Sequence, residues 1–316
     1  MARKYRPSIR HLIYVREFPV SDSNAISIEA WNSVLFDKFC RFRYALTHGL
    51  SARSDEVLRR RPYASGGRIL DIGCGFGDTT RLIAHQAGSG GASVGVDCAP
   101  RFIELANREL VEQPVVNASF FVADVESDEL KGPYDHAFSR FGMMFFGRPG
   151  AALRNIHSAL LPGGSLRMIV WRRRQDNPWI HDAELRVKEI VPVVSHDDTD
   201  QVHCGPGPFS MAGADTVSEL LVYAGFERIS FERFDTEVCI GKTLDDAVDF
   251  AISLGPAGEI IRLAGEQGEQ RRGEVVEAIR QLMTRRLRPD GVWMGSSSWL
   301  VSAWTNRRTK GAACDH

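Results

Sequence analysis

The fold of this chain follows from the stretch ILDIGCGFGDTT at residues 69–80. The stretch predicts a short buried strand, a glycine-rich turn and the start of a helix. Glycine has no Cβ, so Gly73, Gly75 and Gly77 let the backbone turn tightly and come close to a ligand. The free N–H groups at the start of the helix favour an anion such as a carboxylate or a phosphate. A ligand site is therefore expected here, and a purely structural glycine turn is the alternative.

Two features separate this stretch from the turn that binds dinucleotides. The third glycine comes one residue too early for G-x-G-x-x-G, and Asp71 ends the strand two residues before Gly73. A carboxylate at that position would repel a pyrophosphate but could pair with an ammonium group. S-adenosylmethionine carries an ammonium, a carboxylate and an adenosine, and it is the cofactor that we expect. A nucleotide-dependent oxidoreductase is the disfavoured alternative.

Composition is typical of a globular protein with one core and accessory elements. The chain has 316 residues, 43% of them hydrophobic and 25% charged. A net charge of −1 argues against a nucleic-acid-binding surface. The six cysteines form no C-x-x-C pair, which fits a reducing compartment. Because no signal peptide and no apolar run of membrane-spanning length is evident, we expect a soluble, cytoplasmic protein without a membrane span.

Strands and helices alternate along the first half of the chain. This order predicts an α/β fold with a doubly wound, mainly parallel sheet. The strand at 165–171 is mostly apolar, as expected of a strand buried on both faces. The expected strands are residues 68–72, 93–97, 120–123, 134–139 and 165–171, and helices are expected at 78–86, 100–111 and 153–161.

A helix is expected before the first strand. Its apolar residues fall at 28, 31, 35, 39, 42 and 46, and Gly49 is a plausible end. This helix either packs against the core without a further role or forms a lid over the cofactor.

The second half of the chain has a looser pattern. Residues 172–210 are polar with four prolines, longer than an ordinary connection and therefore a candidate binding element. A helix is expected at 215–224 and a strand at 229–240. Thr243 to Asp246 gives a T-x-x-D start to a helix ending at Leu254. Further helices are expected at 259–264 and 274–287, and a final strand at 299–305.

These elements divide the chain into six segments. We expect an N-terminal arm and cap helix (1–60), a cofactor-binding core (61–175), a substrate-side loop (176–210), a continuation of the core (211–241), a helical lid (242–290), and a final strand with a tail (291–316).

Three carboxylates follow the first three strands. In an open parallel sheet the carboxyl ends of the strands form the edge where ligands bind. Asp71 would lie near the methionine ammonium, directly or through water. Asp97 suits the two ribose hydroxyls. Asp124 suits the exocyclic amine of adenine, with the backbone N–H of Val125 facing a ring nitrogen. One such acid is easily a helix cap, but three in this order favour an adenosine site.

The sequence resembles the class I S-adenosylmethionine-dependent methyltransferases, in the broad group that includes ubiquinone and menaquinone biosynthesis methyltransferases. The resemblance covers roughly residues 24–306. It rests on the stretches at 69–77, 95–97, 123–124, 138–142, 161–164 and 224–226, and on Trp31-Asn32, 143–146, Trp171, 177–179 and 205–209.

This resemblance implies a Rossmann-like, seven-stranded sheet with a reversed last strand and a helical lid that carries the acceptor pocket. It also implies cofactor contacts at Gly73, Asp97, Asp124 and Ser139. Cys98-Ala99-Pro100 departs from the hydrophobic residue followed by Ser-Pro that relatives often have, which affects the side-chain contact at residue 99 but not the ribose acid. The full set of expected cofactor-binding residues is Asp71, Gly73, Gly75, Gly77, Thr80, Asp97, Cys98, Asp124, Val125, Ser139 and Arg140.

The implied reaction is an SN2 transfer of a methyl group to a small-molecule acceptor. Because the sulfonium is already activated, positioning supplies much of the acceleration. Aromatic residues near the expected mouth of the sheet suggest an apolar or planar acceptor. The candidate pocket residues are Trp31, Phe141, Met144, Phe145, Trp171, Trp179 and Phe209.

A general base is needed only if the acceptor must lose a proton. The candidates are His181 and His203, with Asp182 and His196 beside them, and an ordinary surface role competes for each. No spacing defines a metal site, so we expect no metal. A non-catalytic S-adenosylmethionine-binding regulatory or assembly protein is the alternative function. The sequence leaves a homodimer open.

Overall fold

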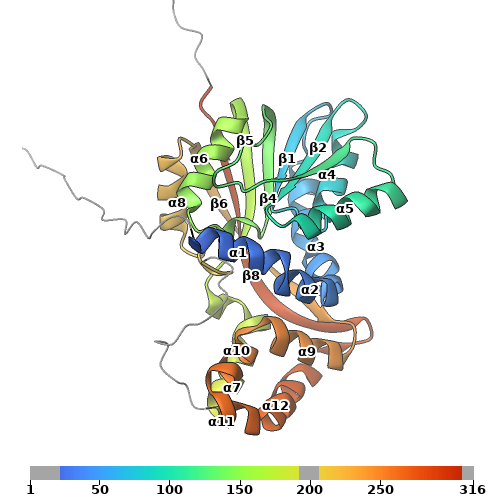
Figure 1. The fold of residues 1–316 in the computed structure, drawn as a ribbon, viewed down its shortest axis with the longest axis vertical. Helices are drawn as coiled ribbons and strands as arrows, with labels where there is room; N and C mark the ends of the chain where they lie inside the picture. The colour runs from blue at the N-terminus through green and yellow to red at the C-terminus, as the bar shows by residue number, and fades with distance from the viewer. Residues whose placement is uncertain (1–21, 192–205, 308–316) are drawn as a thin grey trace, which may run out of the picture.

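One mixed sheet forms the centre of the molecule (Figure 1). The computed structural model describes residues 22–191 and 206–307. The strands run in the order β3-β2-β1-β4-β5-β8-β6, with the short β7 paired to β8. Pairing is parallel from β3 to β5, and β8 is antiparallel to both β5 and β6. The strands are β1 (Arg68–Ile72), β2 (Ala92–Asp97), β3 (Ala118–Val122), β4 (Tyr134–Arg140), β5 (Leu160–Trp171), β6 (Glu227–Gly241), β7 (Leu287–Arg288) and β8 (Gly291–Trp304).

The predicted fold class is confirmed. Seven strands form the main path with β8 reversed, and β7 adds two residues beside it. Helices α4 (Asp78–Ala87) and α5 (Pro100–Glu112) contact β1, β2 and β3, whereas α6 (Pro149–Ala159) and α8 (Ala214–Tyr223) contact β5 and β6. Side chains alternate between the faces of a strand, so the nearly continuous burial of β1 and β2 means that both faces are covered.

Strands β6 and β8 extend beyond the rest of the sheet. The pairing of β5 with β8 stops at Ser298, but β6 and β8 remain paired as far as Gly241 and Val292. Figure 1 shows this two-stranded extension running into a group of helices at the other end of the molecule. They are α7 (Pro178–Ile190), α9 (Leu244–Leu254), α10 (Pro256–Leu263), α11 (Gly265–Gln270) and α12 (Arg272–Thr284). We call these five helices the helical unit.

The expected start of α9 is present. Thr243 accepts a hydrogen bond from the backbone N–H of Asp246, and the Asp246 side chain accepts one from the backbone N–H of Thr243. The T-x-x-D pattern is therefore a capping box. Within residues 22–191 and 206–307, we find no helix with the length and apolar character to cross a membrane.

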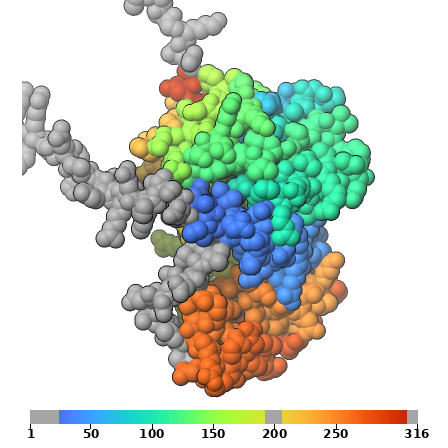
Figure 2. All heavy atoms as spheres, in the orientation of Figure 1, coloured from blue at the N-terminus to red at the C-terminus, as the bar shows by residue number. Residues whose placement is uncertain are grey.

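The single helix expected before the sheet is three helices. These are α1 (Asp22–Asn32), α2 (Val34–Arg41) and α3 (Arg43–Arg60), separated at Ser33 and Phe42. Figure 2 shows α1 and α2 lying across the junction between the sheet and the helical unit. The expected end at Gly49 was wrong, because α3 continues for eleven residues beyond it. Gly49 instead lies where α3 crosses β6, and a Cβ there would be 2.3 Å from the carbonyl oxygen of Cys239.

The segment 176–210, expected to be a loop, contains a regular helix. This helix is α7, and it directly follows the short 3-10 helix η2 (Arg174–Asp176). A second 3-10 helix, η1 (Met143–Phe145), follows β4. Pro178, one of the four prolines of the segment, lies in the first turn of α7, where proline is favourable. Asn177 ties this start to the sheet, since its side-chain oxygen accepts from the backbone N–H of Ser297 at 2.9 Å. The final strand likewise starts at Gly291 rather than 299.

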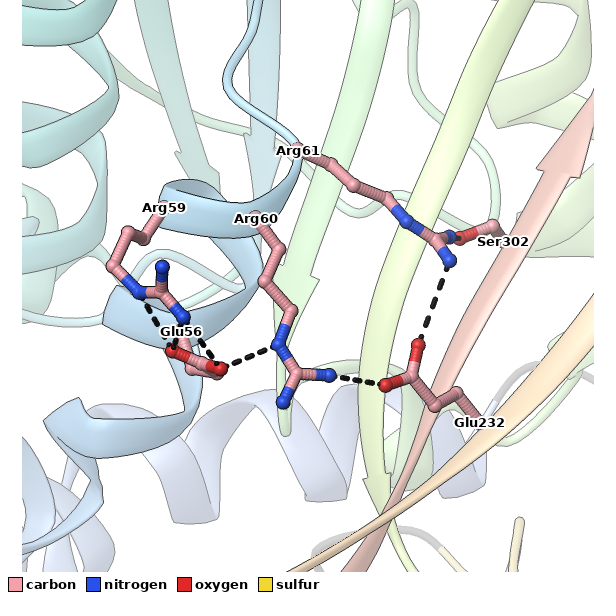
Figure 3. Close-up of polar contacts among 6 residues, drawn as sticks. All are labelled: Glu56, Arg59, Arg60, Arg61, Glu232 and Ser302. Atoms are coloured by element: carbon pink, nitrogen blue, oxygen red, sulfur yellow. Dashed lines mark hydrogen bonds and ion pairs between the residues drawn. The ribbon is translucent and has the colours of Figure 1, made fainter.

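An arginine-rich cluster joins the end of α3 to the outer strands (Figure 3). Arg59 donates two hydrogen bonds to Glu56, both at 2.9 Å. Arg60 bridges Glu56 and Glu232, and Arg61 reaches Glu232 at 3.5 Å. Exposed ion pairs contribute little to stability. These contacts fix where the end of α3 lies against β6.

The close packing of α3 on β6 leads to a stability prediction. Replacing glycine by alanine in a helix normally stabilises it by about 1 kcal/mol. We expect Gly49→Ala to destabilise the fold by about 2 kcal/mol instead, because the new Cβ would meet the backbone of Cys239. Gly273→Ala in α12 is the matched control, since its Cβ would lie more than 4 Å from every other described residue outside its own helix backbone and chain neighbours. Urea unfolding measures both changes, and equal stabilisation by both would contradict the packing argument.

Candidate functional site

One cavity lies at the carboxyl ends of the central strands. Its volume is about 330 Å³. The glycine turn and the ends of β2 and β4 line one end, which we call the donor end. Residues of β6, α7 and α9 line the other, which we call the acceptor end. Helices α1, α2 and α3 supply side chains along the cavity between these ends.

The three glycines of the turn have different roles. All have positive φ angles: 63° at Gly73, 52° at Gly75 and 75° at Gly77. A Cβ on Gly73 would lie 3.0 Å from Gly142 Cα, and one on Gly77 would lie 2.5 Å from the Phe120 ring. At Gly75, which lines the cavity, no atom of the described residues beyond its chain neighbours lies within 4 Å of the Cβ position. Gly73 and Gly75 line the cavity, whereas Gly77 allows α4 to pack against β3.

Asp97 is held by the backbone at the donor end. Its two carboxylate oxygens accept hydrogen bonds from the N–H groups of Gly75 and Ala99, each at 3.0 Å. Burial raises the pKa of Asp97, and the bonds from Ala99 and Gly75 oppose that rise. Because each oxygen keeps a second lone pair, the carboxylate can still accept from hydroxyl groups in the cavity.

Asp71 lies behind the turn rather than on the cavity wall. It is 1% exposed, and one of its oxygens accepts from the hydroxyls of Thr79 at 2.8 Å and Thr80 at 2.6 Å. The other oxygen has no hydrogen-bond partner among the described residues. Burial raises the pKa of Asp71 to about 6, although both threonine hydroxyls lower it. The group therefore stabilises the fold fully below about pH 4, and this contribution is lost as the pH rises through about 6.

Asp124 lines the donor end and is anchored by helix α1. Asn24 donates to it at 2.7 Å, Ser127 donates at 3.0 Å, and the backbone N–H of Glu126 donates at 2.9 Å. Val125 lines the cavity beside it. The bond from Asn24 closes α1 over this end of the cavity.

The remaining cofactor candidates divide into two groups. Arg140 and Cys98 line the cavity, and Arg140 forms an ion pair with Asp78 at 2.6 Å. Ser139 is fully buried and donates to the carbonyl oxygen of Ile72 at 3.0 Å. Thr80 is also fully buried, where it serves Asp71. Ser139 and Thr80 therefore form hydrogen bonds to residues of β1 that precede the glycine turn.

Most of the acceptor candidates come together in the cavity. Phe141 stacks on Trp171, with ring centroids 4.1 Å apart, and Trp171 lies 5.2 Å from Trp179. Trp31 meets Phe145 edge to face at 5.0 Å. Phe209 is not part of the wall, which uses its neighbour Pro208 instead. The predicted residues that line the cavity are Trp31, Phe141, Met144, Phe145, Trp171 and Trp179.

The candidate bases do not reach the described cavity wall. His181 lies on α7 next to Ile180, which does line the cavity, but His181 itself does not. Asp182 follows it on the same helix. His203 and His196 lie outside the described residues. Across residues 22–191 and 206–307, no three His, Cys, Asp or Glu side chains are grouped to hold a metal ion.

Several wall residues were missed in the sequence. Asn24 and Asp78 complete the donor end, and Cys239, Phe250 and Leu254 complete the acceptor end. Asp78 follows the glycine turn directly, so the motif itself could have indicated it. The other four come from segments far from the motif, and no local pattern marks them.

Comparison with known proteins agrees with this geometry. Residues 69–164 match a family described as "Methyltransferase domain". The ubiquinone/menaquinone biosynthesis C-methyltransferase of Shewanella oneidensis is 26% identical over 184 residues, which cover 56% of this chain and 71% of that protein. The enzyme of the same name from Pseudomonas aeruginosa is 26% identical over 177 residues, covering 54% and 68%.

Solved structures show the same fold. Phosphoethanolamine N-methyltransferase 2 of Haemonchus contortus, in complex with S-adenosyl-L-methionine, has a TM-score of 0.54 and 15% identity, covering 89% of this chain and 60% of that chain. A methyltransferase structure from Bacillus halodurans has a TM-score of 0.51 and 13% identity, covering 81% and 99%. The glycine turn, the reversed β8 and the family match over residues 69–164 support a class I S-adenosylmethionine-dependent methyltransferase that resembles the ubiquinone and menaquinone biosynthesis enzymes.

Proposed function

We propose that this protein transfers a methyl group from S-adenosylmethionine to a small, apolar or planar acceptor. The observation that carries this proposal is a continuous cavity that runs from Asp97 and Asp124 to an aromatic and aliphatic acceptor end. The similar bacterial proteins are named for ubiquinone and menaquinone biosynthesis, which supports an acceptor of this kind. A non-catalytic binding protein would not need open space beyond the donor end.

The residues at the donor end fit the cofactor. Asp97 would accept from the ribose hydroxyls, because its oxygens have lone pairs to spare after the bonds from Gly75 and Ala99. Asp124 would accept from the adenine amine. The open Cβ position at Gly75 leaves room for the ligand against the backbone. The Asp71 oxygen that has no partner among the described residues would favour the ammonium group, directly or through water.

The chain would act mainly by positioning. The cofactor supplies a methyl group on a sulfonium, ready for displacement by a nucleophilic atom of the acceptor. Trp171, Phe141 and Trp179 would hold a planar acceptor against that methyl group and exclude water. Among the described wall residues, no histidine or lysine is present to take a proton. An acceptor whose nucleophilic atom does not need a protein side chain to remove a proton fits this wall best.

Cofactor binding tests the donor end. We expect Asp97→Ala to weaken the binding of S-adenosylhomocysteine by roughly 100-fold, because the ribose hydroxyls would lose a charged acceptor. Isothermal titration measures the dissociation constant. Asp245→Ala on the helical unit is the control, since Asp245 is exposed and pairs only with Arg280 among the described residues. An unchanged constant in the Asp97 variant, or no binding by the wild type, would overturn the proposal.

The raised pKa of Asp71 predicts a pH dependence of cofactor affinity. The pKa of Asp71 is about 6 in the empty protein, and a nearby ammonium would lower it. Below about pH 6, binding must therefore release a proton from Asp71. The affinity for the cofactor should then fall by up to about tenfold for each unit by which the pH is lowered. We expect this part of the pH dependence to disappear in Asp71→Asn. Isothermal titration of the cofactor at several values between pH 5 and 8 measures this dependence. If affinity changes with pH equally in the wild type and in Asp71→Asn, Asp71 does not interact with the ammonium group.

A further inference from the structure

Arg53 is a fully buried cation beside the acceptor end. It lies on α3, has no exposed surface, and is among the largest fully buried side chains. One nitrogen, Nη2, donates to Ser296 Oγ. The other two, Nε and Nη1, have no hydrogen-bond partner among the described residues. No carboxylate forms an ion pair with Arg53 in the part of the chain that the structure describes.

The guanidinium contacts the rings that form the cavity wall. Its central carbon lies 4.7 Å from the ring centroid of Trp171 and 5.9 Å from that of Phe141. Both rings line the cavity, whereas Arg53 does not. Phe141 has a φ of 62°, an unusual value for a bulky residue, so its backbone is held in a strained conformation. Arg53 therefore packs behind a strained part of the wall.

Charges are distributed unevenly along the cavity. The carboxylates of the wall are all at the donor end, where Asp78 is paired with Arg140 and Asp97 and Asp124 accept hydrogen bonds. The described residues that complete the acceptor end are uncharged: Trp179, Ile180, Val238, Cys239, Ile240, Phe250 and Leu254. Among the described residues of the acceptor end, no carboxylate offsets the positive charge of Arg53.

A pure packing role does not explain this arrangement. Burying an arginine without a carboxylate partner is costly, and an apolar side chain of similar volume would often serve packing better. Aromatic faces attract cations, so an aromatic cavity by itself would favour a cationic ligand. A cation already lying against Trp171 has the opposite effect on a second positive charge.

We propose that Arg53 is a specificity-determining residue that makes the acceptor site select neutral or anionic planar molecules and reject cationic ones. This inference rests on the proposed function, because it names the class of acceptor that the same cavity takes. Arg53 acts through Trp171 and Phe141 and does not touch the acceptor.

Two probes of nearly the same shape test this selection. N-methylquinolinium and 1-methylnaphthalene are planar bicyclic molecules that differ by one permanent positive charge. Their dissociation constants are measured by quenching of tryptophan fluorescence, using the full chain with and without saturating S-adenosylhomocysteine. We expect Arg53→Met to tighten the binding of N-methylquinolinium roughly tenfold while changing that of 1-methylnaphthalene less than about twofold. Arg53→Lys keeps the charge and should keep the wild-type ratio of the two constants.

Two further variants guard the interpretation. Arg53→Gln removes the charge with a polar side chain, so it tests the same ratio if the methionine variant does not fold. Arg154→Met is the matched control, because Arg154 lies 4.7 Å from the ring centroid of Tyr223, away from the cavity wall. An unchanged ratio in both neutral Arg53 variants would overturn the inference. Failure of the wild type to bind S-adenosylhomocysteine would instead overturn the proposed function, while the ratios without it still test Arg53.

Discussion

The parallel pairing of β1 between β2 and β4 is the constraint on which the rest of the structure depends. It pairs Asp71 with Gly95 on one side and Phe138 on the other. Because parallel strands end at the same edge, the glycine turn, Asp97 and Phe141 are brought together without any local signal that links them. The same pairing buries Asp71, whose raised pKa is a cost that the hydroxyls of Thr79 and Thr80 reduce.

The antiparallel β6–β8 extension provides the second half of the site. It continues beyond the end of β5 and carries the helical unit, so residues of β6 and α9 face the donor end across one cavity. Antiparallel strands can extend as a paired ribbon without a crossover helix, which makes such an extension feasible. Gly49 allows α3 to pack closely against this ribbon, and Arg53 one turn later reaches the aromatic wall. The acceptor end therefore depends on contacts between segments far apart in the chain.

Predictions from local pattern succeeded where one segment carried the signal. The strands of the core and the capping box at Thr243 came from periodicity and from a short motif. Gly49 was misjudged because its close contact with Cys239 involves β6, which follows much later in the sequence. Helix α7 was missed because the prolines of residues 172–210 indicated a loop, whereas Pro178 starts the helix and Asn177 bonds to Ser297 of a distant strand. Arg53 was not noticed, since an arginine in a polar helix gives no sign of burial.

The sequence by itself determined the fold class and the donor end. Glycine spacing and acids after strands express backbone and hydrogen-bonding requirements that are local, and they can be recognised without knowing what packs around them. Tertiary structure alone decided that β6 and α9 complete the acceptor end, that Asn24 closes on Asp124, and that Arg53 lies behind Trp171. The physical reason is that burial and charge environment are properties of contacts between distant segments. Asp71, Thr80 and Ser139 illustrate the difference, because the motif places them near the turn but only packing shows that they lie behind the residues that line the cavity.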